Sequence, residues 1–269
     1  MGASISAAAG DQPGYSLRRG AIGPSLASAG VPTSGANALA RKLARIGSLS
    51  GPDHLALAQM YARPVEVRSG SAILREGEAQ RGVCVLLDGW ACRYKRLAGG
   101  RRQIFAILLP GDLCDARGLV QADADHGVSA LTSVLIARTP IETMSVVMRD
   151  HPRIAEAVRQ AALLEQKALR AWLLNLGVRK ARERVAHLFC ELSYRTGEIG
   201  LWLENGAFRL PLTQQEIGES LGLTSVHVNR VLQGLRAEGL LDFSNGVLHI
   251  PDVEYLRRIS GFDQRYLKS

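Results

Sequence analysis

The sequence has no stretch long enough to cross a membrane and no loop typical of nucleotide hydrolysis. A membrane-spanning helix needs about 18 apolar residues, and the apolar runs of this sequence, such as Ile104–Leu109, are far shorter. The start, MGASISAAAG, lacks the basic and then apolar segments of a secretory signal. The G-x-x-x-x-G-K-[ST] pattern does not occur. We therefore expect a cytoplasmic protein that has no membrane partner and is not an enzyme.

Cysteine and histidine are scarce and scattered. The chain has four cysteines, at Cys84, Cys92, Cys114 and Cys190, and six histidines, none of which is paired with another one residue away. An iron–sulfur site needs closely spaced cysteines, and a cupin-like metalloenzyme needs clustered histidines. We expect no metal site and no catalytic residue, and we expect buried structural thiols. A redox-sensing cysteine stays open as an alternative.

The net charge of +8 favours an anionic partner. Residues 36–150 hold fifteen basic and eleven acidic side chains, whereas residues 179–269 hold twelve and eleven. The basic excess is therefore not concentrated in the C-terminal part. The local cluster Arg179, Lys180, Arg182 and Arg184 could contact phosphates, or it could be an ordinary solvated helix face.

Composition divides the chain into four parts. Residues 1–35 are rich in Ala, Gly, Ser and Pro, and we expect a disordered tail. Residues 36–150 begin with helical patterns and continue as short β-like runs with Gly-rich turns, which is typical of an antiparallel sandwich or small barrel. Asp88–Gly89 is a two-residue hairpin signal.

Residues 151–178 predict one long helix that ends at Gly177. Its apolar positions approximate a coiled-coil stripe, formed by Ile154, Val158, Ala161, Leu164, Ala168 and Trp172. A helix of this length has to bury such a stripe. We expect a self-paired dimerisation helix, and packing against the chain's own β-rich part is the alternative.

Residues 179–269 predict a helical unit that contains a helix-turn-helix. Thr213 can cap a first helix, because Glu216 follows at the capping-box spacing. Gly222 ends that helix, and Thr224 caps a second one whose polar face carries His227, Asn229 and Arg230 among others. A hairpin wing around Asn245–Gly246 and a short helix over Val253–Ile259 follow. This layout is typical of a protein that places its second helix in the DNA major groove.

The order of a β-rich part, a long helix and a winged helix-turn-helix resembles the Crp/Fnr superfamily of bacterial transcription regulators. The likeness covers residues 37–260, and it is carried most specifically by Leu212–Thr224, by Val228–Leu232 and by the segment L-L-P-G-D at Leu108–Asp112. The resemblance implies an α+β fold. It consists of an N-terminal jelly roll like that of cyclic-nucleotide-binding domains, a dimerisation helix and a C-terminal winged helix-turn-helix.

The resemblance also implies which residues contact DNA. The expected contacts are Thr213, Gln214, Thr224, Ser225, Val226, His227, Asn229 and Arg230. Arg230 can bond guanine in bidentate fashion and is the first candidate for base specificity. Many members carry Glu or Arg where this chain has Ser225 and Val226, so its target sequence should differ from theirs.

The matching effector pocket departs from cyclic-nucleotide binders. The family glutamate falls at about Ala116, and no Arg or Lys occurs between Gly118 and Ala130 to neutralise a cyclic phosphate. A buried phosphate without a cation is costly. We therefore expect no cofactor and no cyclic nucleotide. Residues that could line another effector site are Asp112, Cys114, Asp115 and Arg117.

These observations together predict a sequence-specific regulator that binds a two-fold symmetric double-stranded DNA operator as a homodimer. RNA polymerase is the expected further partner. A regulator of the same fold that responds to a cyclic nucleotide, to redox state or through haem stays open as the alternative. A cupin-like metalloenzyme is a remote alternative, and the lack of a kinase motif or membrane span disfavours a regulatory module of a kinase or channel.

Overall fold

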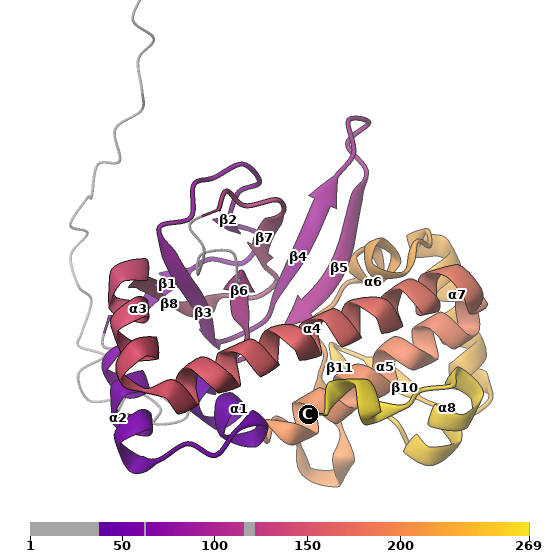
Figure 1. Ribbon diagram of the computed structural model, residues 1–269. Coiled ribbons are helices and arrows are strands. Elements are labelled where there is room, and N and C mark those ends of the chain that lie inside the picture. Colours follow the sequence, from indigo (N-terminus) through magenta and orange to yellow (C-terminus); the bar gives the residue numbers. More distant parts are fainter. Residues whose placement is uncertain (1–37, 62, 116–121, 269) are drawn as a thin grey trace, which may run out of the picture. The chain divides into compact units, whose positions relative to one another are not determined.

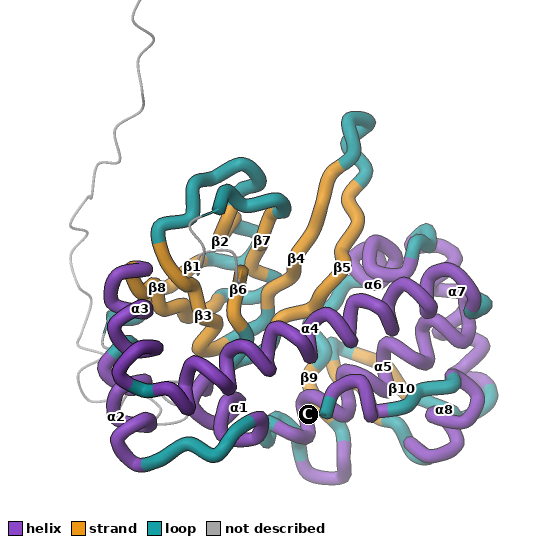
Figure 2. Tube along the Cα trace, in the orientation of Figure 1, coloured by secondary structure: helices purple, strands orange, loops and turns teal. Residues whose placement is uncertain are grey.

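The computed structural model describes residues 38–61, 63–115 and 122–268. The predicted disordered tail and Arg117 lie outside the described residues. Within the described part, helices and antiparallel strands combine as Figures 1 and 2 show, and the predicted α+β fold class is confirmed. No described helix has both the length and the apolar character needed to cross a membrane. The boundaries of the four predicted parts stay predictions.

Two four-stranded antiparallel sheets form a β-roll over residues 65–140. The first has the order β1-β8-β3-β6 and consists of β1 (Val65–Val67), β8 (Val134–Pro140), β3 (Gly82–Asp88) and β6 (Leu113–Asp115). The second has the order β2-β7-β4-β5 and consists of β2 (Ala72–Leu74), β7 (Gly127–Ala130), β4 (Ala91–Arg96) and β5 (Arg102–Leu108). Side chains of both sheets, including Leu86, Val128 and Ile136, are buried in one shared core.

The hairpin predicted at Asp88–Gly89 is wrong. Gly89 does adopt a positive φ of 81°, but β3 and β4 on either side of this turn belong to different sheets. The Trp90 carbonyl accepts hydrogen bonds from the N–H groups of Leu131 and Thr132, at 2.8 and 3.2 Å. A turn residue reports only local backbone geometry. Distant partners decide whether the flanking strands pair with each other.

Four helices cover one side of the first sheet. They are α1 (Ala38–Ile46), α2 (Gly51–Gln59), α3 (Ile141–Asp150) and the start of α4 (Pro152–Val178). Leu43, Met144 and Ile154 bury their side chains together with Val85 of β3. Pro152 suits the first turn of α4, where a missing N–H leaves no hydrogen bond unmade. The predicted long helix is confirmed, although it ends at Val178 rather than at Gly177.

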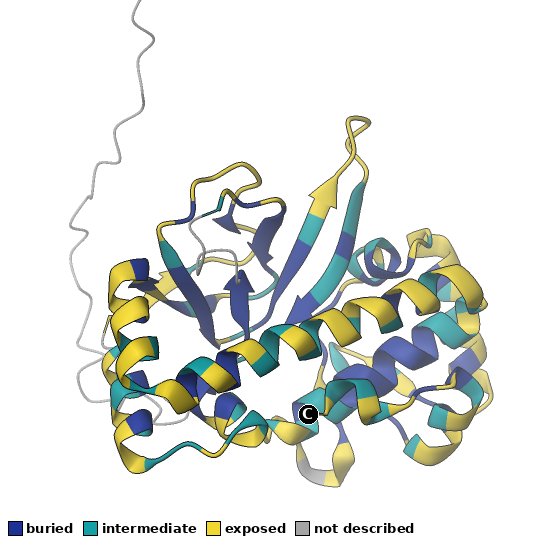
Figure 3. Ribbon diagram, in the orientation of Figure 1, coloured by how far each residue is buried: buried dark blue, intermediate teal, exposed yellow. Residues whose placement is uncertain are grey.

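The predicted stripe of α4 packs inward. Ile154 and Val158 are at most 1% exposed against α1 and β3, and Trp172 is buried in the C-terminal core. Ala161, Leu164 and Ala168 are half-buried. Ile154 and Val158 thus pack against the chain's own N-terminal part, which is the alternative that the sequence leaves open, and pairing of α4 with a second copy stays a prediction. Leu163, Leu169, Leu173, Leu174 and Val178 of α4 are exposed, and the outward side of this helix is largely exposed in Figure 3.

Residues 181–267 form the helix-turn-helix unit. Its elements are α5 (Ala181–Glu198), η2 (Glu204–Gly206), β9 (Phe208–Arg209), α6 (Gln214–Leu221), α7 (Ser225–Ala237), β10 (Asp242–Ser244), β11 (Val247–His249), α8 (Val253–Ser260) and η3 (Gln264–Leu267). Phe189, Phe208 and Leu232 are central to its core. The predicted wing is confirmed, since β10 and β11 pair around Asn245 and Gly246 at φ of 50° and 71°.

Charged side chains connect the β-roll with the helix-turn-helix unit. Arg102 Nε of β5 donates to Glu219 Oε2 of α6 at 2.6 Å, and Gln103 Nε2 donates to the Ser220 carbonyl at 3.3 Å. Arg195 of α5 donates to Asp112 Oδ2, after the end of β5, at 2.8 Å. The orientation of the helix-turn-helix unit against the β-roll therefore depends on these polar contacts as well as on apolar packing.

Candidate nucleic-acid interface

The first helix of the helix-turn-helix begins with a reciprocal cap. Thr213 Oγ1 accepts the Glu216 N–H at 3.1 Å, and Glu216 Oε2 accepts the Thr213 N–H at 2.8 Å. These bonds satisfy backbone donors that the first turn of a helix otherwise leaves unpaired. The predicted capping box is confirmed, and it places Thr213 and Gln214 at an exposed or half-exposed helix N-terminus.

Two glycines shape the turn between α6 and α7. Gly222 has a φ of 65°, a left-handed conformation that ends α6 as predicted. Gly218 lies within α6, where a Cβ atom would come within 2.5 Å of the Leu223 carbonyl oxygen. Sequence patterns alone did not single out Gly218. The only signal was a glycine inside an otherwise regular helix, which can mark a close approach of backbone.

The second helix presents its polar face to solvent. Thr224 Oγ1 accepts the His227 N–H at 3.2 Å and caps α7, while Val228, Leu232 and Leu235 are buried beneath the helix. Ser225, Val226, His227 and Arg230 are exposed, and Asn229 is half-buried. Val226 is 69% exposed, which is unusual for an apolar side chain next to a buried face. The turn therefore brings together every residue predicted to contact DNA.

Arg230 is available to an external partner. Among the described residues, none forms a hydrogen bond or ion pair with its guanidinium, whereas nearby Arg236 donates to the Phe243 carbonyl at 2.5 Å. A planar guanidinium that is not already paired can form two parallel hydrogen bonds with one acceptor edge. Of these two arginines of α7, Arg230 is therefore the one suited to reading a guanine.

The basic cluster at the start of α5 is structural. Arg179 donates to the carbonyls of Ser260 and Gly261, at 2.8 and 2.9 Å. Arg184 donates to the Arg179 and Leu221 carbonyls at 2.8 and 3.1 Å, and Arg182 pairs with Glu238. These side chains fasten α5 to α8, to the end of α6 and to the end of α7. This tertiary role favours a structural reading over phosphate contact for three of the four residues.

Ser220 lies in the segment Gly218–Gly222, whose letters G-E-S-L-G match the G-x-S-x-G pattern of hydrolase nucleophiles. That pattern requires an exposed serine on a strand-to-helix turn. Ser220 is instead fully buried inside α6, and its hydroxyl donates to the Glu216 carbonyl at 2.8 Å. The match is therefore coincidental and indicates no catalytic site.

Of the predicted effector residues that the structure describes, Asp112 lines a cavity and Cys114 and Asp115 do not. Asp112 is 7% exposed, and its carboxylate binds Lys42 Nζ at 2.5 Å and Arg195 Nη2 at 2.8 Å. Burial alone would raise the pKa of Asp112, but the charges of Lys42 and Arg195 outweigh burial and lower that pKa. Cys114 lies in the sheet core instead.

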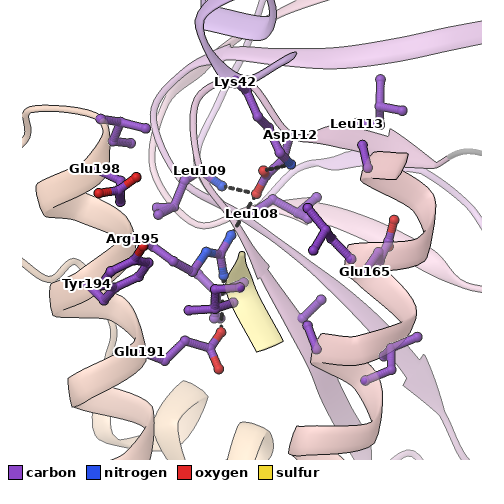
Figure 4. A pocket seen from close by; sticks show the side chains of 18 of the residues that line it. Lys42, Leu108, Leu109, Asp112, Leu113, Glu165, Glu191, Tyr194, Arg195 and Glu198 are labelled. Atoms are coloured by element: carbon purple, nitrogen blue, oxygen red, sulfur yellow. Dashed lines mark hydrogen bonds and ion pairs between the residues drawn. The ribbon is translucent and has the colours of Figure 1, made fainter. Parts of the chain in front are cut away.

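Asp112 faces a cavity of about 550 Å³ between β5, α1, α4 and α5, which Figure 4 shows from close by. Arg195 pairs with Glu191 as well as with Asp112. The Glu191 carboxylate also accepts hydrogen bonds from Trp172 Nε1 at 2.9 Å and from the Tyr266 hydroxyl at 2.7 Å. The basic side chains that line this cavity are thus largely paired with acidic ones. No group of three or more His, Cys, Asp or Glu among the described residues could hold a metal ion.

A β-roll followed by a long helix and a capped helix-turn-helix defines a DNA-binding regulator with a sensor-type domain. Comparisons with known families agree with that class. Residues 64–151 match the cyclic nucleotide-binding domain family, and residues 183–259 match the Crp-like helix-turn-helix domain family. The chain belongs to the Crp/Fnr superfamily of transcription regulators.

Individual relatives cover most of the chain. The transcriptional activator protein FnrL of Cereibacter sphaeroides is 30% identical over 195 residues, which are 71% of this chain and 76% of that protein. The nitrogen fixation regulation protein FixK of Bradyrhizobium diazoefficiens is 28% identical over 194 residues, or 71% and 78%. The structure of FixK2 from Bradyrhizobium japonicum is 26% identical with a TM-score of 0.65, and the match covers 73% of this chain and 96% of that one.

Proposed function

We propose that this regulator binds a two-fold symmetric operator as a homodimer, with α7 of each copy in the major groove. The observation that carries the proposal is the exposed polar face of α7, with an unpaired Arg230, on a helix that is capped and supported by a buried core. A helix-turn-helix uses this face to contact base edges. Arg230 reads a guanine through O6 and N7, and exposed Val226 suits a thymine methyl group.

The helix N-termini supply the phosphate contacts. Thr213 and Thr224 are the N-caps of α6 and α7, and the first turn of a helix has more backbone N–H groups than its cap satisfies. The positive end of the helix dipole favours an anion there. Ser225 and His227 flank these positions and add hydroxyl and imidazole donors. Because Ser225 and Val226 replace charged side chains of many relatives, the half-site sequence differs from theirs.

A second copy of this chain covers the outward face of α4. Leu173 and Leu174 are 70% and 60% exposed, and Val178 is 79% exposed. Leu163 and Leu169 are exposed as well on this helix, which joins the two halves of the chain. Several exposed large apolar side chains on one helix favour an interaction surface. Pairing two copies through α4 also supplies the two-fold symmetry that a palindromic operator requires.

We propose that the regulator carries no resident cofactor and does not respond to a cyclic nucleotide. β7 (Gly127–Ala130) is buried and, like the whole stretch from Gly118 to Ala130, contains no Arg or Lys. A cyclic phosphate held there would lack a counter-charge. The protein works in the cytoplasm, and RNA polymerase is the second macromolecule that it meets on DNA.

Selection of bound sequences from random duplex DNA tests this function with the full-length protein. We expect an enriched motif with two-fold symmetry, whose half-sites lie about 10 base pairs apart. Affinity should fall steeply between low and physiological salt, because phosphate contacts release counterions. Cyclic AMP should leave the motif and the affinity unchanged. A protein that stays monomeric and enriches no motif would contradict the proposal.

A further inference from the structure

Two of the four cysteines lie side by side in the β-roll. Cys84 is on β3 and Cys114 is on β6, which is its antiparallel neighbour. The register pairs Cys84 with Asp115 and Val85 with Leu113, so Cys114 is the extra residue at an irregularity between them. Both side chains belong to the core between the sheets, whereas Val85 and Leu113 belong to the core on the other face. Both thiols therefore belong to the same core on neighbouring strands.

Their surroundings make the two sulfur atoms chemically unequal. The hydrogen bond from Cys114 lowers the pKa of the Cys84 thiol, burial opposes this, and the positive charge of Arg138 lowers that pKa further. Arg138 is the direct cross-strand partner of Cys84 on β8. The same hydrogen bond, together with burial, raises the pKa of Cys114. The cation beside Cys84 favours its thiolate form, and Cys114 on the neighbouring strand is placed to attack the oxidised product.

Among the described residues, the other two cysteines contact serine hydroxyls. Cys92 of β4 lies 3.3 Å from the Ser129 hydroxyl, and Cys190 of α5 accepts a long hydrogen bond from Ser260 at 3.8 Å. Burial raises the pKa of Cys190 to about 12. Cys84 is 6% exposed, whereas the Cys92 side chain is completely buried. Among the described strands, β6 is a three-residue edge strand.

The segment that contains β6 is also connected to α4 and α5. Arg93 donates from Nε to the Cys114 carbonyl and from Nη2 to the Leu113 carbonyl, both at 2.8 Å, and Arg93 pairs with Glu165 of α4. Asp112, two residues before Cys114, pairs with Arg195 of α5. Figure 4 shows Asp112 and Leu113 close to these helices. A shift of Cys114 therefore moves groups that hold both α4 and α5.

We propose that Cys84 and Cys114 are a peroxide-sensitive dithiol site, and that their disulfide is a signal input to the helix-turn-helix unit. The Cys84 sulfur attacks one oxygen of hydrogen peroxide, the O–O bond breaks, and a sulfenic acid and water form. The Cys114 sulfur then attacks the Cys84 sulfur, the S–O bond breaks, and a second water leaves with the Cys114 proton. Two thiols are oxidised to one disulfide while one peroxide is reduced to two waters.

Peptide mapping of the full-length protein tests the site. Reduced protein is treated with hydrogen peroxide, free thiols are alkylated, and trypsin then separates residues 82–93 from residues 103–117. We expect a linked pair of these peptides that has lost two hydrogen atoms and that separates with dithiothreitol. Because residues 82–93 contain both Cys84 and Cys92, the matched control is Cys92→Ser, which should keep the link. Cys84→Ser and Cys114→Ser should abolish it.

The wild-type result does not depend on whether any variant folds. A link through Cys92, or oxidation of Cys84 to sulfinic acid without a link, would overturn the site. The signalling half of the inference rests on the proposed function and needs a selected operator. We expect the linked protein to bind that operator with an affinity changed by about fivefold or more, which is the lower end of ordinary allosteric coupling.

Dithiothreitol should restore the original affinity, and Cys114→Ser should show no response to peroxide. A disulfide that forms without changing DNA affinity would overturn the signalling half alone. Failure of the reduced protein to bind any operator would instead contradict the proposed function, and the peptide map would still decide the dithiol site.

Discussion

Arg230 is the residue on which base recognition depends most directly. Replacing it with Ala should weaken operator binding by about 1–3 kcal/mol and relax one base position in each half-site, because a bidentate contact to guanine is lost. Competition titrations against operators mutated at single positions measure both effects. The matched control is Arg153→Ala, which removes the same charge from an exposed position of α4. Equal losses in the two variants would contradict a base contact by Arg230.

His187 makes the stability of the helix-turn-helix unit depend on pH. Burial and the charge of Arg179 lower its pKa from 6.5 to about 3, and its ring packs against Phe262 and Tyr266. The unfolded chain therefore binds a proton that the native protein excludes. The stabilising effect of the neutral ring is complete above pH 6.5 and declines as the pH falls toward 3.

When the pH is lowered from 7 to 5, protonation of His187 in the unfolded chain should reduce the free energy of unfolding by about 2 kcal/mol. Urea titrations at both pH values measure the difference. His187→Gln should remove most of the pH dependence and lower stability at pH 7. An unaltered slope in His187→Gln would show that other groups govern this pH range.

At the scale of elements, Gly218 decides how tightly α6 turns into α7. A Cβ atom there would lie 2.5 Å from the Leu223 carbonyl oxygen, which belongs to backbone and cannot move aside cheaply. Gly218→Ala should therefore destabilise the protein by about 2 kcal/mol. Gly234→Ala is the matched control, because that glycine lies in α7, where a Cβ atom would meet no other atom within 4 Å.

In the control, alanine should stabilise the helix by about 0.5–1 kcal/mol, since it has the higher helix propensity. Chemical denaturation of the two variants beside the wild type checks both signs. If Gly218→Ala were as stable as Gly234→Ala, the close approach at the turn would not constrain this segment.

The elements that sequence predicts best are those whose signals are local. The caps at Thr213 and Thr224, the left-handed Gly222 and the wing turn at Asn245–Gly246 all depend on a few neighbouring residues. The Asp88–Gly89 turn shows the limit of such signals. Its backbone conformation agrees with the prediction, but the next strand belongs to the other sheet. At the start of that strand the Trp90 carbonyl accepts hydrogen bonds from Leu131 and Thr132.

At the scale of the whole molecule, the outward face of α4 should hold two copies together. Leu173 is 70% exposed, and burying such a side chain from each copy contributes about 3 kcal/mol per dimer. Leu173→Glu should therefore weaken the dimer about a hundredfold or more, with added repulsion between symmetric carboxylates. Sedimentation over a concentration series measures the dissociation constant.

Leu55→Glu provides the matched control, because Leu55 is 66% exposed on α2, away from that face. It should leave the dissociation constant unchanged. Equal dissociation constants for Leu173→Glu and the wild type would place the interface elsewhere. The Leu173 variant should also lose operator affinity, because a single copy contacts only one half-site.

The sequence by itself determined the order of the parts, the helix-turn-helix with its caps, and the chemical types on the reading face. Periodicity, turn residues and capping residues are local, and they do not depend on what packs against them. Only the tertiary structure decided which partners the longer-range groups choose. It buried Ile154, Val158 and Trp172 inside the chain, paired the arginines of α5 with carbonyls, and set Cys84 beside Cys114. Those choices depend on residues far apart in sequence, because side-chain burial and ion pairing are satisfied only when distant segments meet.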